Sequence, residues 1–307
     1  MIEYGGLQQA EGLRRIQDGL LMVTPFRRVV RLFQNARFKL LQDRFQRIYG
    51  TEVVTEVAGA RLSLDLREMH DVRMFADISR HGAYEPETTR LLTRLLAPGD
   101  TFVDVGANNG YFALIAGRCV GAGGTVVAIE PNPAAVERLA RNVALNELAT
   151  TIRILPIAVG ESDGEGSLYV STFEDGWTSL VPFRGSKPPV SVRVAMLDHL
   201  LAPCDSLVLK VDTEGTELHV VRGMSLLLES ARNVAMILEW NHLFGTRTLW
   251  ESLRSRFHIS LIRPDPSAPG VRLQEVREWD QLRSLFLGNL LLTSGPRWTA
   301  TVGAMRA

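Results

Sequence analysis

Apolar residues from Thr101 onward fall into short runs, separated by longer stretches with helical spacing. The runs predict seven buried strands, at Thr101–Val105, Thr125–Ile129, Ile152–Val159, Leu207–Val211, Val234–Leu238, His258–Ile262 and Leu287–Leu292. The intervening stretches predict helices at Tyr111–Val120, Pro133–Asn146, Thr216–Glu229 and Thr246–Phe257. Strands that alternate with helices are typical of a doubly wound parallel sheet, so the predicted fold class is α/β.

Further β patterns flank this core. Residues Thr51–Leu66 alternate between apolar and polar side chains as in a hairpin, and a helix is predicted to follow at Pro86–Leu96. Between the third and fourth strands, Ser167–Val170 and Val190–Met196 predict an extra β element around the polar loop Glu174–Pro189. The chain therefore carries smaller β units outside its main sheet.

The N-terminal segment has a different pattern. Apolar residues between Leu7 and Ile48 recur at helical intervals among many arginines, which predicts two or three amphipathic helices broken near Pro25. We expect a lid or a dimer contact; a basic amphipathic helix can alternatively lie on a membrane surface. We divide the chain into an N-terminal helical extension (1–50) and a hairpin and helix that lead into the core (51–97). An α/β domain (98–294) and a C-terminal tail (295–307) follow.

Charge and cysteine content narrow the class of protein. The 34 basic residues balance 34 acidic ones, so no overall field attracts nucleic acid. Cys119 and Cys204 lie far apart without metal-ligand spacing, which suits buried thiols in a reducing compartment. No apolar run is long enough to span a membrane, and Met1–Ala10 lacks the pattern of a signal peptide. We expect a cytoplasmic protein that binds no nucleic acid.

The segment from Asp104 to Gly110 reads Asp-Val-Gly-Ala-Asn-Asn-Gly and links the first strand of the sheet to its helix. Glycines at such a junction allow a tight turn and let a ligand approach the backbone closely. They are four residues apart, unlike the dinucleotide fingerprint G-x-G-x-x-G, and the loop lacks the Lys-Ser/Thr of a phosphate-binding P-loop. The loop therefore predicts a ligand other than NAD or ATP, which disfavours a dehydrogenase.

Glu130 ends the next strand and is followed by Pro131-Asn132-Pro133. In nucleotide-binding α/β folds, an acidic side chain at this interval after the glycine loop accepts hydrogen bonds from ribose hydroxyls. A lone carboxylate at a strand end is often only a helix cap or a solvated group. The glycine loop upstream favours the nucleoside-binding interpretation.

The ends of two later strands are also polar. They carry Asp212, Glu214, Glu239, Asn241 and His242. Because carboxyl ends of neighbouring parallel strands face one crevice, these residues predict an acid/base or metal-binding wall. The alternative is that the acids pair only with one another or with Lys210. Glu217 is interpreted as an ordinary acid in the first turn of a helix.

Several ordered motifs resemble those of the FkbM-type methyltransferases, S-adenosylmethionine (SAM)-dependent enzymes that mostly O-methylate hydroxyl groups. The matching segments are Gly82–Glu87, Pro98–Asp100, Asp104–Asn108 with Gly110 and Tyr111, Glu130–Pro133, Asn142–Asn146, Ala158–Gly160, Leu197–Asp198, Lys210–Glu217 and, weakly, Gly288–Leu290. The resemblance extends from Thr51 to Ser294. Two residues depart from it: Thr213 replaces a common aliphatic residue, and His242 replaces a common proline, which could mark a local catalytic difference.

The resemblance implies a class I methyltransferase fold, a Rossmann-like seven-stranded doubly wound sheet, with residues 98–294 as the SAM-binding domain. It implies that the methionine end of SAM is bound by Gly106, Asn108 and Gly110, and the ribose by Glu130. It implies that the adenine contacts Asn132, Ala158 and Val159. It also implies that Tyr84 and Glu85 approach SAM from the N-terminal side. Asp104 and Asp212 are acids that the positively charged sulfonium tolerates nearby.

Methyl transfer to an alcohol needs an acceptor for the hydroxyl proton. The candidate catalytic residues are Asp212, Glu214, Glu239 and His242. In the alternative, which resembles the catechol-type methyltransferase layout, a Mg²⁺ ion held by Asp212, Glu239 and Asn241 would lower the pKa of the hydroxyl. The sequence leaves this choice open.

The acceptor is not specified by any motif. Phe173, Trp177 and Phe183, in and beside the polar loop, could stack on a sugar, a polyketide or another natural product, or could be core residues. We expect a small-molecule acceptor with a hydroxyl group. N-methylation of a small molecule or peptide, and a non-catalytic SAM-fold partner protein, are the alternatives. The amphipathic N-terminus makes a homodimer reasonable.

Overall fold

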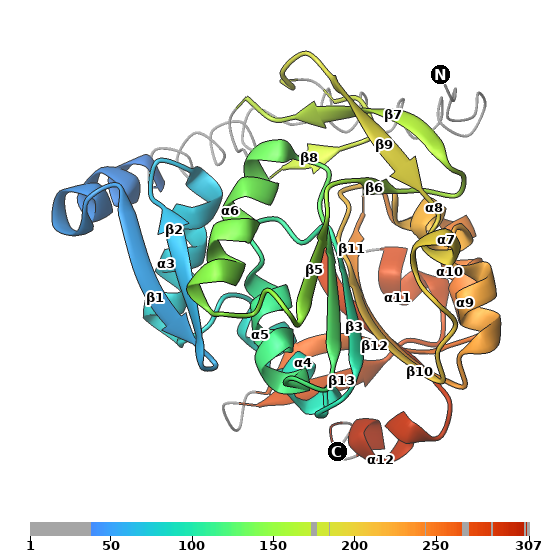
Figure 1. The fold of residues 1–307 in the computed structure, drawn as a ribbon. Coiled ribbons are helices and arrows are strands. Elements are labelled where there is room, and N and C mark those ends of the chain that lie inside the picture. Colours follow the sequence, from blue (N-terminus) through green and yellow to red (C-terminus); the bar gives the residue numbers. More distant parts are fainter. Residues whose placement is uncertain are drawn as a thin grey trace.

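The computed structural model describes residues 38–303 and 305, apart from 173–176, 184, 243, 266–269 and 284. Figure 1 shows a central sheet with helices on both faces, a smaller second sheet, and an N-terminal hairpin at one side. Most of the predicted N-terminal helical segment lies outside the described residues, which begin with a helix over 38–49.

The central sheet has eight strands in the order β13-β12-β14-β11-β10-β3-β4-β5. Their bounds are Thr101–Val105 (β3), Thr125–Ile129 (β4), Ile152–Leu155 (β5), Ser206–Val211 (β10), Asn233–Asn241 (β11), His258–Pro264 (β12), Val271–Glu275 (β13) and Leu287–Ser294 (β14). The predicted count of seven was wrong because β13 was missed. This edge strand alternates buried and exposed residues and lacks a continuous apolar run.

Strands β5, β4, β3, β10 and β11 pair in parallel, whereas β14 runs antiparallel between β11 and β12. In this register Asn289 lies opposite Glu239, and Leu287 lies opposite Asn241. The start of β14 therefore reaches the polar end of β11, although 50 residues of sequence separate Glu239 from Asn289.

Helices cover both faces of the sheet, as the doubly wound prediction requires. One face packs against α4 (Pro86–Leu95), α5 (Tyr111–Val120), α6 (Pro133–Leu145) and α12 (Arg297–Gly303); the other packs against α7 (Leu197–Leu200), α8 (Glu217–Arg222), α9 (Ser225–Ser230), α10 (Arg247–Arg254) and α11 (Trp279–Arg283). Neighbouring residues of a strand point to opposite faces, so Phe102 and Val103 of β3 belong to different hydrophobic clusters.

Two predicted elements are divided, each for a local reason. Ile152–Val159 splits into β5 and β6 (Ala158–Val159), because Pro156 has no N–H to donate to a strand ladder. Thr216–Glu229 splits into α8 and α9 around Gly223, where a Cβ atom would come within 2.0 Å of the Gly160 carbonyl oxygen. Strand β6 leaves the central sheet and starts the second one.

The second sheet confirms the extra β element that the sequence predicted. Its order is β6-β9-β7-β8, with β7 at Gly164–Val170, β8 at Thr178–Ser179 and β9 at Val190–Ala195. Only β6 and β9 pair in parallel. The sheet projects from the end of the main sheet at which Ala158 and Val159 lie.

The predicted hairpin consists of β1 (Glu52–Val57) and β2 (Ala60–Asp65), joined by a turn with positive φ at Ala58 and Gly59. Helix α3 (Met69–His81) follows and was not predicted. The side chains of Asn142 in α6 and of Asn146, which follows this helix, each exchange hydrogen bonds with the backbone of β2, at Ser63 and Arg61 respectively. These amides fix the hairpin, and α3 after it, against the main domain.

Two further expectations concern membranes and thiols. None of the helices in the described part of the chain has the length and apolar character needed to cross a bilayer. Cys119 and Cys204 are free thiols, and both are half-buried rather than fully buried as the sequence suggested.

Candidate active site

A cavity of about 430 Å³ lies at the carboxyl ends of β3, β4, β10 and β11. Its walls include most of the residues singled out from the sequence: Tyr84, Glu85, Gly106, Asn108, Glu130, Asn132, Ala158, Val159, Asp212, Glu214, Glu239 and Asn241. Asp104, Gly110 and His242 are not among the lining residues. The structure thus gathers the glycine loop, the ribose candidate and the acidic wall around one space.

Gly106 joins the glycine loop to the acidic wall. Its φ is +86°, and a Cβ atom there would lie 1.8 Å from the backbone oxygen of Asp212. The backbone N–H of Asp212 in turn donates to the Val105 carbonyl at 3.0 Å. Only glycine permits this contact, so Gly106 decides how close the loop comes to Asp212.

Gly110 packs between two helices, and its implied contact with SAM stays a prediction. Its φ is +92°, and a Cβ atom there would lie 2.4 Å from Cδ1 of Leu139 in α6. The residue immediately precedes α5 and lets the two helices approach each other. Packing against α6 is enough to explain why this position requires glycine. Gly110 is not among the residues that line the cavity.

Glu130 is buried at the edge of the cavity and is held by two backbone donors. Its Oε2 accepts a hydrogen bond from the Asn108 N–H at 2.9 Å, and its Oε1 accepts one from the Asn132 N–H at 2.8 Å. Burial raises the pKa of Glu130 to about 7 despite these bonds. Each carboxylate oxygen keeps a lone pair, so the side chain fits a role as acceptor for two ribose hydroxyls.

Asp104 lies beneath the cavity floor, 1% exposed, on the strand next to Lys210. Burial raises the pKa of Asp104 to about 7, and the charge of Lys210 opposes this shift. Asp104 therefore belongs to a buried charge network under the site, and the structure gives it no direct path to a ligand.

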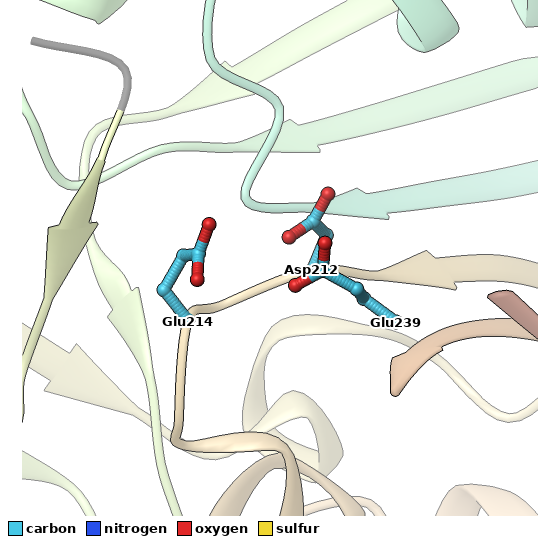
Figure 2. Close-up of side chains that lie close together, drawn as sticks. All are labelled: Asp212, Glu214 and Glu239. Atoms are coloured by element: carbon cyan, nitrogen blue, oxygen red, sulfur yellow. The ribbon is translucent and has the colours of Figure 1, made fainter. Parts of the chain in front are cut away.

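Three carboxylates form the acidic wall. One oxygen from each of Asp212, Glu214 and Glu239 lies within 4.8 Å of the other two, and Figure 2 shows these side chains grouped at the strand ends. Burial, then repulsion from Asp212 and Glu214, raises the pKa of Glu239. Nζ of the buried Lys210 donates to Oδ2 of Asp212 at 2.6 Å. The wall is thus a partly neutralised cluster of acids.

The loop that carries two of these acids is braced from both sides. Oε1 of the buried Glu217 accepts hydrogen bonds from the N–H groups of Thr213 and Gly215, at 3.2 and 3.1 Å. The Ser179 hydroxyl in β8 donates to the Glu214 carbonyl at 2.7 Å. Glu217 begins α8, as expected of a first-turn acid. Its side chain also orders the loop after Asp212, a role that the sequence did not indicate.

Glu85 reaches the cavity from the N-terminal side, as the resemblance implies. Its Oε2 accepts a hydrogen bond from Nδ2 of Asn289 in β14 at 2.7 Å, and Asn289 also donates to the Thr88 hydroxyl at 2.9 Å. Burial raises the pKa of Glu85 and keeps that of the neighbouring Tyr84 well above its usual value. The weak Gly288–Leu290 motif therefore contains a residue that orients Glu85.

His242 lies outside the cavity wall. Its side chain is exposed, its Nδ1 lies 3.0 Å from the Phe286 carbonyl oxygen, and its ring packs on the Phe286 ring with centroids 4.4 Å apart. Its role as a proton acceptor stays a prediction. The three carboxylates are placed better for that role.

Several cavity residues were missed by sequence reasoning. They come from α3 and from the start of β14: His70, Arg73, Met74, Phe286 and Leu287. In α3 the apolar residues Val72, Phe75 and Ile78 recur at helical spacing, and Gly82 ends the helix. That periodicity could have revealed the helix, but no sequence signal indicates which face lines the cavity.

The comparisons with known proteins agree with this geometry. The family model described as the Methyltransferase FkbM domain matches residues 104–281, more than half of the chain. The hexuronic acid methyltransferase AglP of Haloferax volcanii is 28% identical over 185 residues, 59% of this chain and 72% of that protein.

Two O-methyltransferases are among the solved structures that match this chain distantly. One, from Bacillus cereus in complex with S-adenosylhomocysteine (SAH), is 12% identical with a TM-score of 0.40, covering 69% of this chain and 80% of that one. The other, TomG from Streptomyces achromogenes in complex with SAM, is 15% identical with a TM-score of 0.39, covering 69% and 81%.

The family match carries the assignment, and the cavity is consistent with it. The matched region contains the glycine loop, Glu130 and all three carboxylates of the acidic wall. The chain belongs to the FkbM methyltransferase family and is a SAM-dependent methyltransferase.

Proposed function

We propose that this protein O-methylates a hydroxyl group of a small molecule, with a sugar as the acceptor class. The observation that carries the proposal is the cluster of Asp212, Glu214 and Glu239 in the same cavity as Gly106 and Glu130. An alcohol must lose a proton during methyl transfer, whereas the sulfonium itself supplies no base. Carboxylates beside the cofactor loop meet that requirement.

SAM supplies an electrophilic methyl group on its sulfonium. The acceptor oxygen forms a bond to this methyl group while the S–CH₃ bond breaks, and the sulfur keeps the electron pair as the thioether of SAH. The hydroxyl proton passes to the carboxylate cluster. We assign the proton to Glu239 in its ionised form, with Asp212 and Glu214 orienting the hydroxyl; burial and the two neighbouring acids raise the pKa of Glu239, so this form becomes populated as the pH rises.

Two features support a sugar as acceptor. The AglP relative is named for a hexuronic acid substrate. The cavity that contains the acidic wall is also lined by Trp177, which stacks on Phe183 with ring centroids 4.7 Å apart, and by Phe286, which is 63% exposed. Aromatic faces beside hydrogen-bonding carboxylates suit a ring with one apolar face and several hydroxyls.

A divalent cation is the alternative way to activate the hydroxyl. The three carboxylates offer oxygen ligands of the kind that Mg²⁺ prefers, and Asn241 also lines the cavity. Lys210 already places a positive charge 2.6 Å from Asp212 and so balances the charge of one of the three carboxylates without a metal. Activity measured with EDTA and with added Mg²⁺ separates the two: loss with EDTA and recovery with Mg²⁺ would establish the metal.

The test is a methyl-transfer assay with labelled SAM against hexoses, hexuronic acids, phenols and amines, read by mass spectrometry. We expect an O-methylated sugar from the wild type and a loss of about a hundredfold or more in Asp212→Asn. The matched control is Glu229→Gln, at an exposed acid on α9, which should retain full activity. Methylation of amines alone, or of no acceptor while SAM binds, would overturn the proposal.

A further inference from the structure

Asp71 is a fully buried acid of α3 that the methyl-transfer chemistry above does not use. It lies outside residues 104–281, which match the family model, and it does not line the cavity. Burial raises the pKa of Asp71, whereas the charge of His70 and the hydrogen bonds from Asp65 and Asn109 oppose this rise. A buried acid costs free energy unless it is well hydrogen-bonded, so the partners of its two oxygens indicate its role.

The two carboxylate oxygens of Asp71 join segments that are distant in the sequence. Oδ2 accepts a hydrogen bond at 2.8 Å from the backbone N–H of Asp65, the last residue of β2. Oδ1 accepts a hydrogen bond at 3.0 Å from Nδ2 of Asn109 in the glycine loop. Both oxygens act as acceptors, as an ionised carboxylate requires. Asp71 therefore connects the N-terminal hairpin and α3 to the glycine loop.

Asn109 is the residue by which the glycine loop is held. It is 1% exposed, and its Oδ1 accepts a hydrogen bond at 3.3 Å from the N–H of Tyr111, the first residue of α5. Its backbone carbonyl accepts one at 2.9 Å from Nδ2 of Asn142 in α6. With Asp71 on its Nδ2, Asn109 is bonded to α3, α5 and α6 at once.

The preceding residue, Asn108, needs such support. Its backbone is left-handed, with φ +47°, a conformation that costs a non-glycine residue free energy and persists only where its surroundings fix it. In this conformation the Asn108 N–H donates to Oε2 of Glu130 at 2.9 Å. Asn109 therefore holds the part of the loop that presents a hydrogen-bond donor to Glu130.

We propose that Asp71 is a positioning residue for SAM binding and acts through Asn109. It fixes the glycine loop in the conformation in which the Asn108 N–H donates to Glu130. The hairpin and α3 are then part of the cofactor-binding machinery, although Asp71 touches no ligand itself. The proposal goes beyond the proposed function, because it concerns SAM alone and holds for any methyl acceptor.

The experiment reverses the polarity of the contact between Asp71 and Asn109. In Asp71→Asn, one carboxylate oxygen becomes an NH₂ group, which then faces an N–H donor of either Asp65 or Asn109. We expect SAH affinity, measured by calorimetry, to fall about tenfold, while kcat at saturating SAM changes less than about twofold. The combined variant Asp71→Asn/Asn109→Asp restores each donor–acceptor pair and keeps the net charge. Its SAH affinity should return to within about threefold of wild type.

A pH profile of SAH affinity separates positioning from a simple effect of charge. The charged groups that face Glu130 are Arg138 of α6 and Asp104 of β3, and both remain in Asp71→Asn. A loosened loop weakens the hydrogen bond from Asn108 that lowers the pKa of Glu130. The pH at which SAH affinity falls should therefore rise by about half a unit. Loss of a nearby negative charge alone would move this pH downward.

Asp77→Asn is the matched control, because Asp77 is a partly exposed acid on the same helix and does not line the cavity. It should leave SAH affinity and its pH profile unchanged. Asn109→Ala removes the contact from the loop side and should lower SAH affinity at least as much as Asp71→Asn, which provides a second test if Asp71→Asn does not fold.

Three results would overturn the proposal. The first is unchanged SAH affinity in Asp71→Asn or Asn109→Ala with lowered thermal stability, which would make the contact merely structural. The second is a combined variant that folds without recovering affinity. The third is a pH profile of Asp71→Asn that does not move or moves downward. Failure of the proposed function is distinguishable, because SAH binding is measured without an acceptor.

Discussion

The two ends of the cavity are built differently. At one end, Glu130 is fixed by the backbone N–H groups of Asn108, in the loop after β3, and of Asn132, in the loop after β4. At the other end, Glu239 comes from β11, Asp212 and Glu214 from the loop after β10, and Phe286 from the residues just before β14. Because its donors are backbone groups in short loops, the position of Glu130 depends mainly on the local course of the chain. The grouping of Asp212, Glu214 and Glu239 depends on which strands are neighbours in the sheet.

Gly106 lies where the two ends meet, and its substitution should have the largest effect. We expect Gly106→Ala to destabilise the fold by about 3–5 kcal/mol and to abolish SAM binding, because the added Cβ collides with the Asp212 carbonyl at a strained φ. Urea unfolding and calorimetry measure both effects. Gly82→Ala is the control: Gly82 is left-handed, with φ +74° and ψ 0°, but nothing lies within 4 Å of the added Cβ, so only about 1 kcal/mol should be lost. Equal losses in the two variants would contradict the role of the close approach.

Glu239→Gln should affect chemistry and spare cofactor binding. We expect kcat to fall about 10²-fold to 10⁴-fold, since the side chain can no longer accept the hydroxyl proton, with little change in SAH affinity. Because the pKa of Glu239 is raised, wild-type activity should increase with pH as this carboxyl ionises, and the variant should lose that dependence. A wild-type pH profile retained by Glu239→Gln would point to another base, and His242→Ala would then be the next variant to examine.

Glu130→Gln should show the opposite separation. We expect SAH affinity to fall about tenfold to a hundredfold, while kcat at saturating SAM changes little. The pKa of Glu130 is about 7, so protonation below pH 7 removes the charged acceptor, and wild-type SAH affinity should fall by about tenfold per pH unit there. Calorimetry between about pH 5 and about pH 8, on both sides of that pKa, measures this change in SAH affinity. The dependence should vanish in Glu130→Gln and persist in Glu137→Gln, at an exposed acid of α6.

Asn289→Leu tests a smaller, indirect contribution. Removal of its amide leaves the buried Glu85 without its 2.7 Å donor, so we expect a few-fold rise in the KM for SAM and a loss of about 1 kcal/mol in stability. Steady-state kinetics and thermal unfolding measure these changes. Thr88→Val, which removes a hydroxyl that contacts both Asn289 and Glu85 but keeps the 2.7 Å amide donor of Glu85, should have the weaker effect on KM. The reverse order would show that Asn289 acts through Thr88 and α4.

The sequence by itself determined most strands of the central sheet, the helix after the glycine loop, and the Glu130 end of the cavity. Buried parallel strands are continuous apolar runs, so β3 and β4 occur where predicted, and α5 spans the predicted Tyr111–Val120. The glycine loop and Glu130 were identifiable because their function depends on local spacing. Where an element was mistaken, as at Pro156 or β13, a proline or a half-exposed edge strand had weakened the pattern.

Only the tertiary structure decided the other end. Periodicity encodes which residues are buried but not which strand lies beside which, so it could not place Asn289 next to Glu85 or turn the His70 and Arg73 face of α3 toward the cavity. It also could not show that His242 turns outward, because one residue's change of direction at a strand end leaves no trace in spacing. Long-range contacts of this kind depend on the order of the strands and on the path of the loops. Many sequences share one pattern of apolar residues but fold with different strand orders and loop paths.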